Sequence, residues 1–211
     1  MVVDHAEQCE VDPEEDIARV AGVRRALGPQ AKLMADVNCA WSPTFAIEMG
    51  RALEPYKLYW IEEPVATDDI DGSARVADAL ATPIAGYETE IGLYGFRELI
   101  TRGAVDIVQP DIAWAGGFSE CRRIAALAQA HHLMVAPHAF ASAVTLAASL
   151  HFIASIPNGL VLEFDQNPNG LRDELLKQPI EIEPDGMIRL PERPGLGIEL
   201  DRGAVERYRS Q

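Results

Sequence analysis

Four apolar residues, two acidic residues and a proline form the stretch Leu58-Tyr59-Trp60-Ile61-Glu62-Glu63-Pro64. A short apolar run that ends at a proline is typical of a buried strand, because proline cannot donate the next hydrogen bond of a sheet. Comparable apolar runs occur at residues 33–35, 84–85, 105–108, 133–136 and 160–162. Between these runs, apolar residues recur at the three- and four-residue spacing of helices. The chain therefore alternates between strand-like and helix-like segments.

This alternation predicts successive βα units on a parallel sheet. A polar residue follows each apolar run, at intervals of 23 to 27 residues, and the series is Asp36, Glu62, Glu88, Asp111, His138 and Glu163. In a (β/α) TIM-type barrel the carboxyl ends of the strands surround one mouth, where these side chains would meet. We therefore predict an α/β fold of this type. Six runs and a weaker one at residues 2–9 are fewer than eight strands, so we expect a barrel that is incomplete at its N-terminal end.

Two parts are expected along the chain. Residues 1–178 carry the βα pattern and form the barrel domain. Residues 179–211 differ, because the apolar segments 180–182 and 187–190 flank Pro184-Asp185-Gly186, a turn sequence. We expect this tail to form a hairpin that packs on the barrel.

Composition excludes several classes of protein. The chain has 211 residues, of which 48% are hydrophobic, and its formal net charge is −15. Such a charge repels the phosphate backbone, so we expect no nucleic-acid partner. We expect no membrane association and a cytoplasmic location, because neither a leader segment nor a membrane-spanning apolar run is visible. The three cysteines are odd in number and widely spaced, which favours reduced thiols over disulfides or a zinc site: Cys9, Cys39 and Cys121.

Three carboxylates on consecutive predicted strands, Asp36, Glu62 and Glu88, would repel one another unless a cation lay among them. Mg²⁺ suits such a site because it prefers oxygen ligands and keeps positions open for substrate. The alternative is that each acidic residue caps the helix that follows it. Glu63 should point away from Glu62 along an extended strand, which favours Glu62 as the ligand, but the choice stays open because the strand ends there. Glu90 competes with Glu88 as the third ligand in the same way.

His138 follows a predicted strand, and Asp111 follows the strand before it. An imidazole oriented by a carboxylate is a general acid or base near neutral pH. The alternative for His138 is a buried structural histidine. Asn38 is placed to bind substrate from the loop after Asp36, and Glu163 is placed to hold or protonate a substrate oxygen, although both could serve as ordinary loop or capping residues.

Six ordered segments resemble the C-terminal barrel domain of the enolase superfamily, mandelate racemase subgroup: residues 36–38, 60–64, 83–88, 108–111 with Gly116-Gly117, 136–138 and 162–163. The resemblance implies that Asp36, Glu62 and Glu88 bind Mg²⁺. It also implies that the pair His138 and Asp111 moves a proton next to a substrate carboxylate, through an enediolate held by Glu163 among others. Most members of the subgroup are acid-sugar dehydratases, and racemases are a minority.

Two features of the family are not visible. Its N-terminal capping domain is missing from the sequence, and residues 2–10 lack the lysine that family members carry on the strand before the first metal ligand. Without a second base, dehydration of an acid sugar is favoured over the reaction of a racemase or epimerase on a 2-hydroxy acid. A catalytically impaired barrel fragment that retains the metal site is the other alternative. Because an open barrel exposes strand edges, we also expect a homo-oligomer.

Overall fold

A computed structural model describes residues 2–3 and 12–209. Its sheet has six parallel strands in sequence order, each hydrogen-bonded to the next. The strands are β1 (Val2–Val3), β2 (Met34–Asp36), β3 (Ile61–Glu62), β4 (Ile84–Gly86), β5 (Ile107–Val108) and β6 (Met134–Val135). All-parallel pairing in sequence order is the arrangement that repeated βα units produce.

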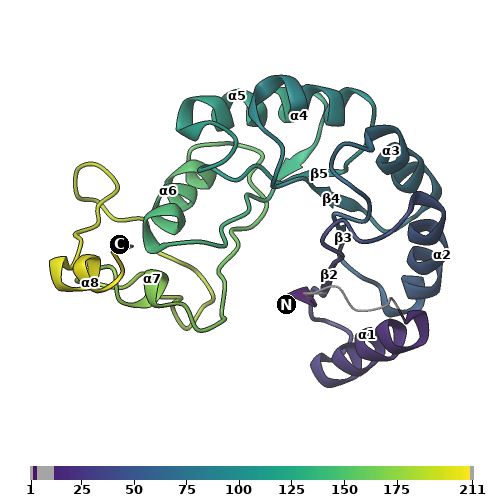
Figure 1. Ribbon diagram of the computed structural model, residues 1–211, viewed down its shortest axis with the longest axis horizontal. Helices are drawn as coiled ribbons and strands as arrows, with labels where there is room; N and C mark the ends of the chain where they lie inside the picture. The colour runs from purple at the N-terminus through teal and green to yellow at the C-terminus, as the bar shows by residue number, and fades with distance from the viewer. Residues whose placement is uncertain (1, 4–11, 210–211) are drawn as a thin grey trace.

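Helices connect the strands and cover the outer side of the arc that the strands form (Figure 1). They are α1 (Pro13–Leu27), α2 (Pro43–Leu53) with the 3-10 turn η1 (Glu54–Tyr56), α3 (Ile70–Ala79), α4 (Gly92–Thr101), α5 (Gly117–Ala130) and α6 (Ala143–Ala154). Two shorter helices, α7 (Gly170–Asp173) and α8 (Arg202–Arg207), belong to the C-terminal segment. Within the described part of the chain, no helix combines the length and apolar character needed to cross a membrane.

Polar caps explain where several helices begin. Asp12 accepts hydrogen bonds from the first turn of α1, with Pro13 at its first position, and Gly28 at φ 78° ends the same helix. Ser42 and Ser142 cap α2 and α6 in the same way. The helices therefore start a few residues after the strand ends, which leaves those residues free to form the mouth of the sheet.

Apolar side chains pack on both faces of the sheet. The larger cluster lies between the strands and the outer helices and includes Ile84, Val108, Phe96, Leu99 and Ile124, all fully buried. A smaller cluster lies on the inner face: Met34, Trp60, Ala85, Ile107 and Ala136. Because side chains alternate along a strand, residues two positions after this inner cluster face the same inner side. Asp36, Glu62 and His138 are three of them.

The structure corrects two expectations. The run 160–162 is not a strand. Leu160 N donates a hydrogen bond to Val135 O, next to an isolated bridge between Val135 and Gly159, but this pairing does not continue along the run. Residues 180–182 and 187–190 are not strands either, although a hydrogen bond from Glu183 N to Met187 O closes the predicted turn. Val2–Val3 does form a strand, while residues 4–9 of that predicted run lie outside the described residues. Apolar content alone thus overestimated strands at the C-terminal side.

Candidate active site

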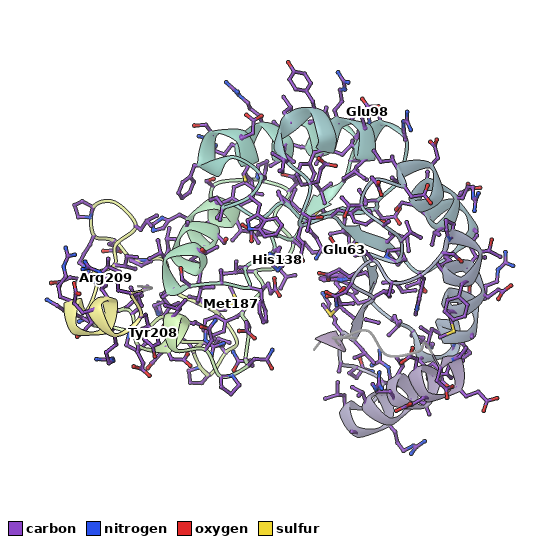
Figure 2. The ribbon with its side chains drawn as sticks, viewed as in Figure 1. Glu63, Glu98, His138, Met187, Tyr208 and Arg209 are labelled. Carbon is purple, nitrogen blue, oxygen red and sulfur yellow. The ribbon has the colours of Figure 1, made fainter. Side chains whose placement is uncertain are left out.

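One pocket of about 570 Å³ lies at the carboxyl ends of the strands. It contains six of the seven predicted site residues: Asp36, Asn38, Glu62, Glu88, His138 and Glu163. The seventh, Asp111, lies behind His138 and is bonded to it. Figure 2 shows His138 on the inner side of the arc. The fold therefore brings together the six side chains that the sequence spaced about 25 residues apart, together with Asn38, which lies two residues after Asp36.

His138 is held between two carboxylates. Its Nδ1 donates to Asp111 Oδ2 at 2.7 Å, and its Nε2 lies 3.2 Å from Glu88 Oε2. Asp111 is itself fixed, because its Oδ1 accepts from the backbone N–H groups of Ala113 and Trp114. Burial by itself would lower the pKa of His138, but the Asp111 hydrogen bond and the negative charges of Glu163 and Glu88 raise it to about 9. The ring is therefore oriented by Asp111 and is basic.

Glu62 is almost fully buried, with 7% of its surface exposed. Its Oε2 accepts a 2.8 Å hydrogen bond from Trp60 Nε1. Burial raises the pKa of Glu62 to about 7, although hydrogen bonds from Gln109 and Trp60 oppose the shift, and the charges of Glu163 and Glu88 add to it. This carboxylate therefore lies in a region with excess negative charge.

Glu88 faces the pocket, whereas Glu90 does not line it. The carboxylate of Glu90 instead accepts from the backbone N–H of Ile91 at 2.8 Å. Burial raises the pKa of Glu88 to about 7; His138 partly offsets this shift, and the charges of Glu63, Asp36 and Glu163 reinforce it. As predicted, Glu63 does not share the pocket with Glu62; it contacts Cys39 and the backbone of Glu88 instead.

The donor set at the pocket fits a hard cation in its chemistry. Asp36, Glu62 and Glu88 supply carboxylate oxygens from three neighbouring strand ends, and burial and mutual repulsion raise the pKa of two of them. Among residues 2–3 and 12–209, however, no three side chains of metal-binding type converge on one point. Glu62 is bonded to Trp60, and Glu88 is turned toward His138.

Gln109 also lines the pocket, although no sequence pattern predicted a role for it. It is 5% exposed, lines the pocket beside Glu62 and lowers the pKa of that carboxyl, while its Oε1 is buried without a hydrogen-bond partner in the described part of the protein. Its position two residues after Ile107, which faces the inner side, was the sequence signal that could have placed Gln109 at the pocket.

Glu163 Oε2 accepts a hydrogen bond from Ala139 N at 2.7 Å and lies 4.0 Å from His138 Nε2.

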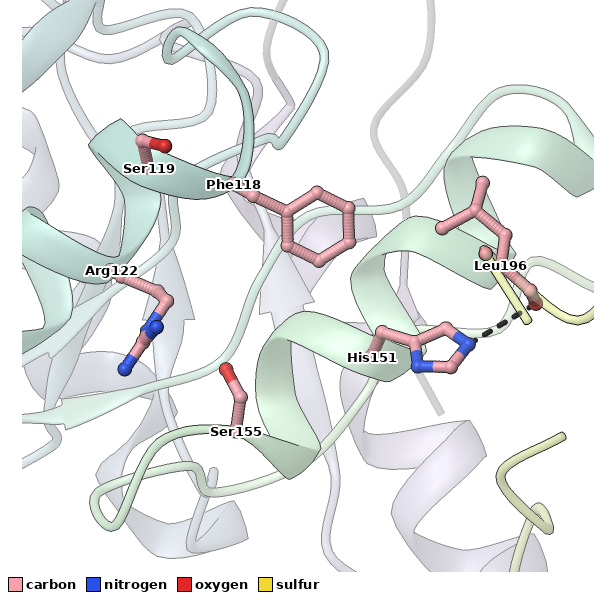
Figure 3. Close-up of a pocket in the computed structure, with 7 residues that line it drawn as sticks. Phe118, Ser119, Arg122, His151, Ser155 and Leu196 are labelled. Atoms are coloured by element: carbon pink, nitrogen blue, oxygen red, sulfur yellow. Dashed lines mark hydrogen bonds between the residues drawn. The ribbon is translucent and has the colours of Figure 1, made fainter. Parts of the chain in front are cut away.

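A second pocket, of about 730 Å³, lies away from the strand ends (Figure 3). It is lined by α5, α6 and the C-terminal segment, through Phe118, Ser119, Arg122, His151, Ser155, Gly195 and Leu196. His151 Nε2 donates to the carbonyl oxygen of Leu196 at 3.1 Å, so this histidine ties α6 to the C-terminal segment. No carboxylate lines this pocket, and it contains none of the predicted site residues.

A parallel α/β sheet with carboxylates and a histidine–aspartate pair at the carboxyl ends of its strands is the arrangement of a barrel-type enzyme domain. The family model described as Enolase C-terminal domain-like matches residues 2–204. The chain belongs to this family, whose structural neighbours include enzymes like mandelate racemase and muconate lactonizing enzyme.

The relatives include enzymes named for reactions of acid sugars or their lactones. The D-galactarolactone cycloisomerase of Agrobacterium fabrum is 39% identical and aligns with 93% of this chain and 54% of its own length. The arabinonate dehydratase of Saccharolobus solfataricus is 40% identical, over 93% of this chain and 52% of that enzyme. This chain thus spans about half the length of the curated relatives it matches.

Magnesium is present in solved relatives and is the usual cofactor of the superfamily. The L-talarate dehydratase of Polaromonas sp. JS666, solved with Mg and L-glucarate, superposes with a TM-score of 0.84 at 35% identity. The alignment covers 98% of this chain and 54% of that structure.

Proposed function

We propose that this chain carries the catalytic machinery for Mg²⁺-dependent removal of a proton α to a carboxylate, followed by loss of water from an acid sugar. The observation that carries the proposal is the position of His138, fixed by Asp111 at 2.7 Å with its other nitrogen toward a pocket of carboxylates. The named relatives, which include acid-sugar dehydratases, support the substrate class.

In this proposal Asp36, Glu62 and Glu88 hold the ion. When bound there, Mg²⁺ supplies positive charge that offsets the repulsion of the carboxylates, lowers the pKa of His138 and stabilises the negative charge that develops on the substrate carboxylate. Asp111 holds Nδ1 protonated, so Nε2 is the nitrogen that accepts the substrate proton.

The remaining residues position the substrate. Glu163, 4.0 Å from His138 Nε2, would hydrogen-bond the carboxylate of the substrate while it has enediolate character, and Asn38 would bind a hydroxyl from the opposite side. The departing β-hydroxyl takes a proton and leaves as water, and the resulting enol becomes a 2-keto acid. His138 serves first as the base that removes the α-proton and then as the acid that supplies this proton to the hydroxyl.

Within the described residues no lysine lines this pocket, which favours one-base dehydration over a two-base racemase or epimerase. The test is incubation with a panel of aldonates and aldarates, with Mg²⁺ and with chelator, in D₂O. We expect a 2-keto acid only with Mg²⁺. Deuterium at the α-carbon without loss of water would instead identify a racemase or epimerase. Magnesium binding without either reaction would identify an impaired barrel fragment.

A further inference from the structure

Glu63 is a buried carboxylate for which the proposed reaction has no use. Only 4% of its surface is exposed, although it follows Glu62 at the rim of the pocket. Its backbone has φ 43°, a left-handed conformation that is uncommon outside glycine. Figure 2 places Glu63 at the inner side of the sheet, near the middle of the arc.

The side chain of Glu63 connects the segments that follow two other strands. Its Oε1 accepts from the backbone N–H of Glu88 at 3.0 Å, just after β4. Its Oε2 accepts from the thiol of Cys39 at 3.3 Å, just after β2. The backbone repeats the second connection, because Cys39 N donates to Glu63 O at 2.8 Å. Glu63, the residue directly after β3, therefore contacts both the segment after β4 that carries Glu88 and the loop after β2 that carries Asn38.

Both connected loops need such support. Asn38 and Cys39 have φ values of 50° and 61°, so the turn after Asp36 is left-handed at two consecutive positions without glycine. On the other side, the N–H of Glu88 would lose its acceptor if Glu63 were shortened. Within the described residues no lysine or arginine forms an ion pair with Glu63, so these polar contacts are what compensate its burial.

We propose that Glu63 is a positioning residue, whose carboxylate fixes the backbone of Glu88 and the turn after Asp36 so that the carboxylates on β2, β3 and β4 face one pocket. The inference rests on the proposed function in one respect, namely that these carboxylates bind Mg²⁺. It assigns to Glu63 no contact with the ion or with substrate. Groups that orient metal ligands typically contribute about 10- to 100-fold to metal affinity.

Two conservative variants separate the position of the acceptor from its charge. Glu63→Asp retains the charge but withdraws the oxygens by one methylene group, so the contact with Glu88 N should be lost. Glu63→Gln retains an oxygen at the same reach without the charge. We expect Mg²⁺ affinity, measured by titration calorimetry, to fall by about tenfold or more in Glu63→Asp and by clearly less in Glu63→Gln.

The matched control is Tyr87→Phe, which removes a buried 2.8 Å hydrogen bond to Ser73 from the residue directly before Glu88. This variant should lower the melting temperature in chelator but leave Mg²⁺ affinity unchanged. If neither Glu63 variant alters Mg²⁺ affinity, or if Glu63→Gln is as damaging as Glu63→Asp, the inference is overturned. Failure of the unmodified protein to bind Mg²⁺ would instead overturn the proposed function.

Discussion

The two halves of the strand-end pocket balance charge in different ways. In the dyad half, formed by Asp111 and His138, a carboxylate faces an imidazole at 2.7 Å. In the carboxylate half, formed by Asp36, Glu62 and Glu88, the pKa values of Glu62 and Glu88 are both raised to about 7, with burial as the main cause. The first half is therefore suited to move a proton and the second to receive a cation.

The largest expected effect is the loss of proton transfer in the dyad half. His138→Asn should lower kcat for 2-keto acid formation by roughly 10²- to 10⁴-fold, the usual contribution of a general acid or base. Mg²⁺ affinity, measured by calorimetry on the same sample, should not fall, because the three carboxylates remain. A variant with normal turnover would show that the two halves do not divide the chemistry in this way.

Cation binding should fail when the carboxylate half is changed. At an Mg²⁺ concentration 100 times Kd, ligand binding stabilises a folded chain by about 2.7 kcal/mol, which appears as a higher melting temperature. Glu62→Gln should abolish that rise. Glu90→Gln is the matched control, since Glu90 follows a neighbouring strand but does not line the pocket, and it should retain the rise. Equal losses in both variants would contradict the assignment of the carboxylate half.

Stability in chelator should fall as the pH rises. The folded-state pKa values of Glu62, Glu88 and His138 are all raised, to about 7, 7 and 9, so the folded chain binds protons more tightly than the unfolded chain. The contribution of the glutamates is complete below about pH 4.5 and is lost as the pH passes about 7, whereas that of His138 is complete below about pH 6.5 and is lost near pH 9.

We expect the free energy of unfolding to decrease by on the order of 5 kcal/mol between pH 5 and pH 8, measured by denaturant titration. Glu62→Gln should flatten this slope, because it removes one of the titrating groups, while Glu90→Gln should leave it unchanged. Stability that increased over the same range would contradict the raised pKa values of Glu62, Glu88 and His138.

The smallest effect is expected at the edge of the pocket. Asn38→Ala should raise KM for an acid sugar by roughly 2- to 13-fold, the equivalent of one hydrogen bond of about 0.5–1.5 kcal/mol. The value of kcat and the Mg²⁺ affinity should change little, because Asn38 is assigned to neither half. An unchanged KM would remove Asn38 from the substrate site.

Sequence patterns predicted the fold well where strands were separated by regular helices. The runs from residues 33 to 136 formed β2 to β6 near their expected places, because alternation of short apolar runs and helices is a local signal. The run 160–162 failed, since a strand also needs a continuous hydrogen-bonding partner, and only Val135 and Gly159 form a bridge there. The expected hairpin after residue 179 kept its turn but lacked paired strands.

Which polar residues meet at the mouth of the sheet follows from their spacing in the sequence. Parallel strands place their carboxyl ends at one edge, so a polar residue repeated about every 25 positions must converge there. How those side chains are oriented and paired depends on the folded chain. It turned Glu88 rather than Glu90 into the pocket, set Gln109 against Glu62, and placed Glu63 between two loops. Beyond a strand end, orientation depends on contacts with distant segments, which no local pattern encodes.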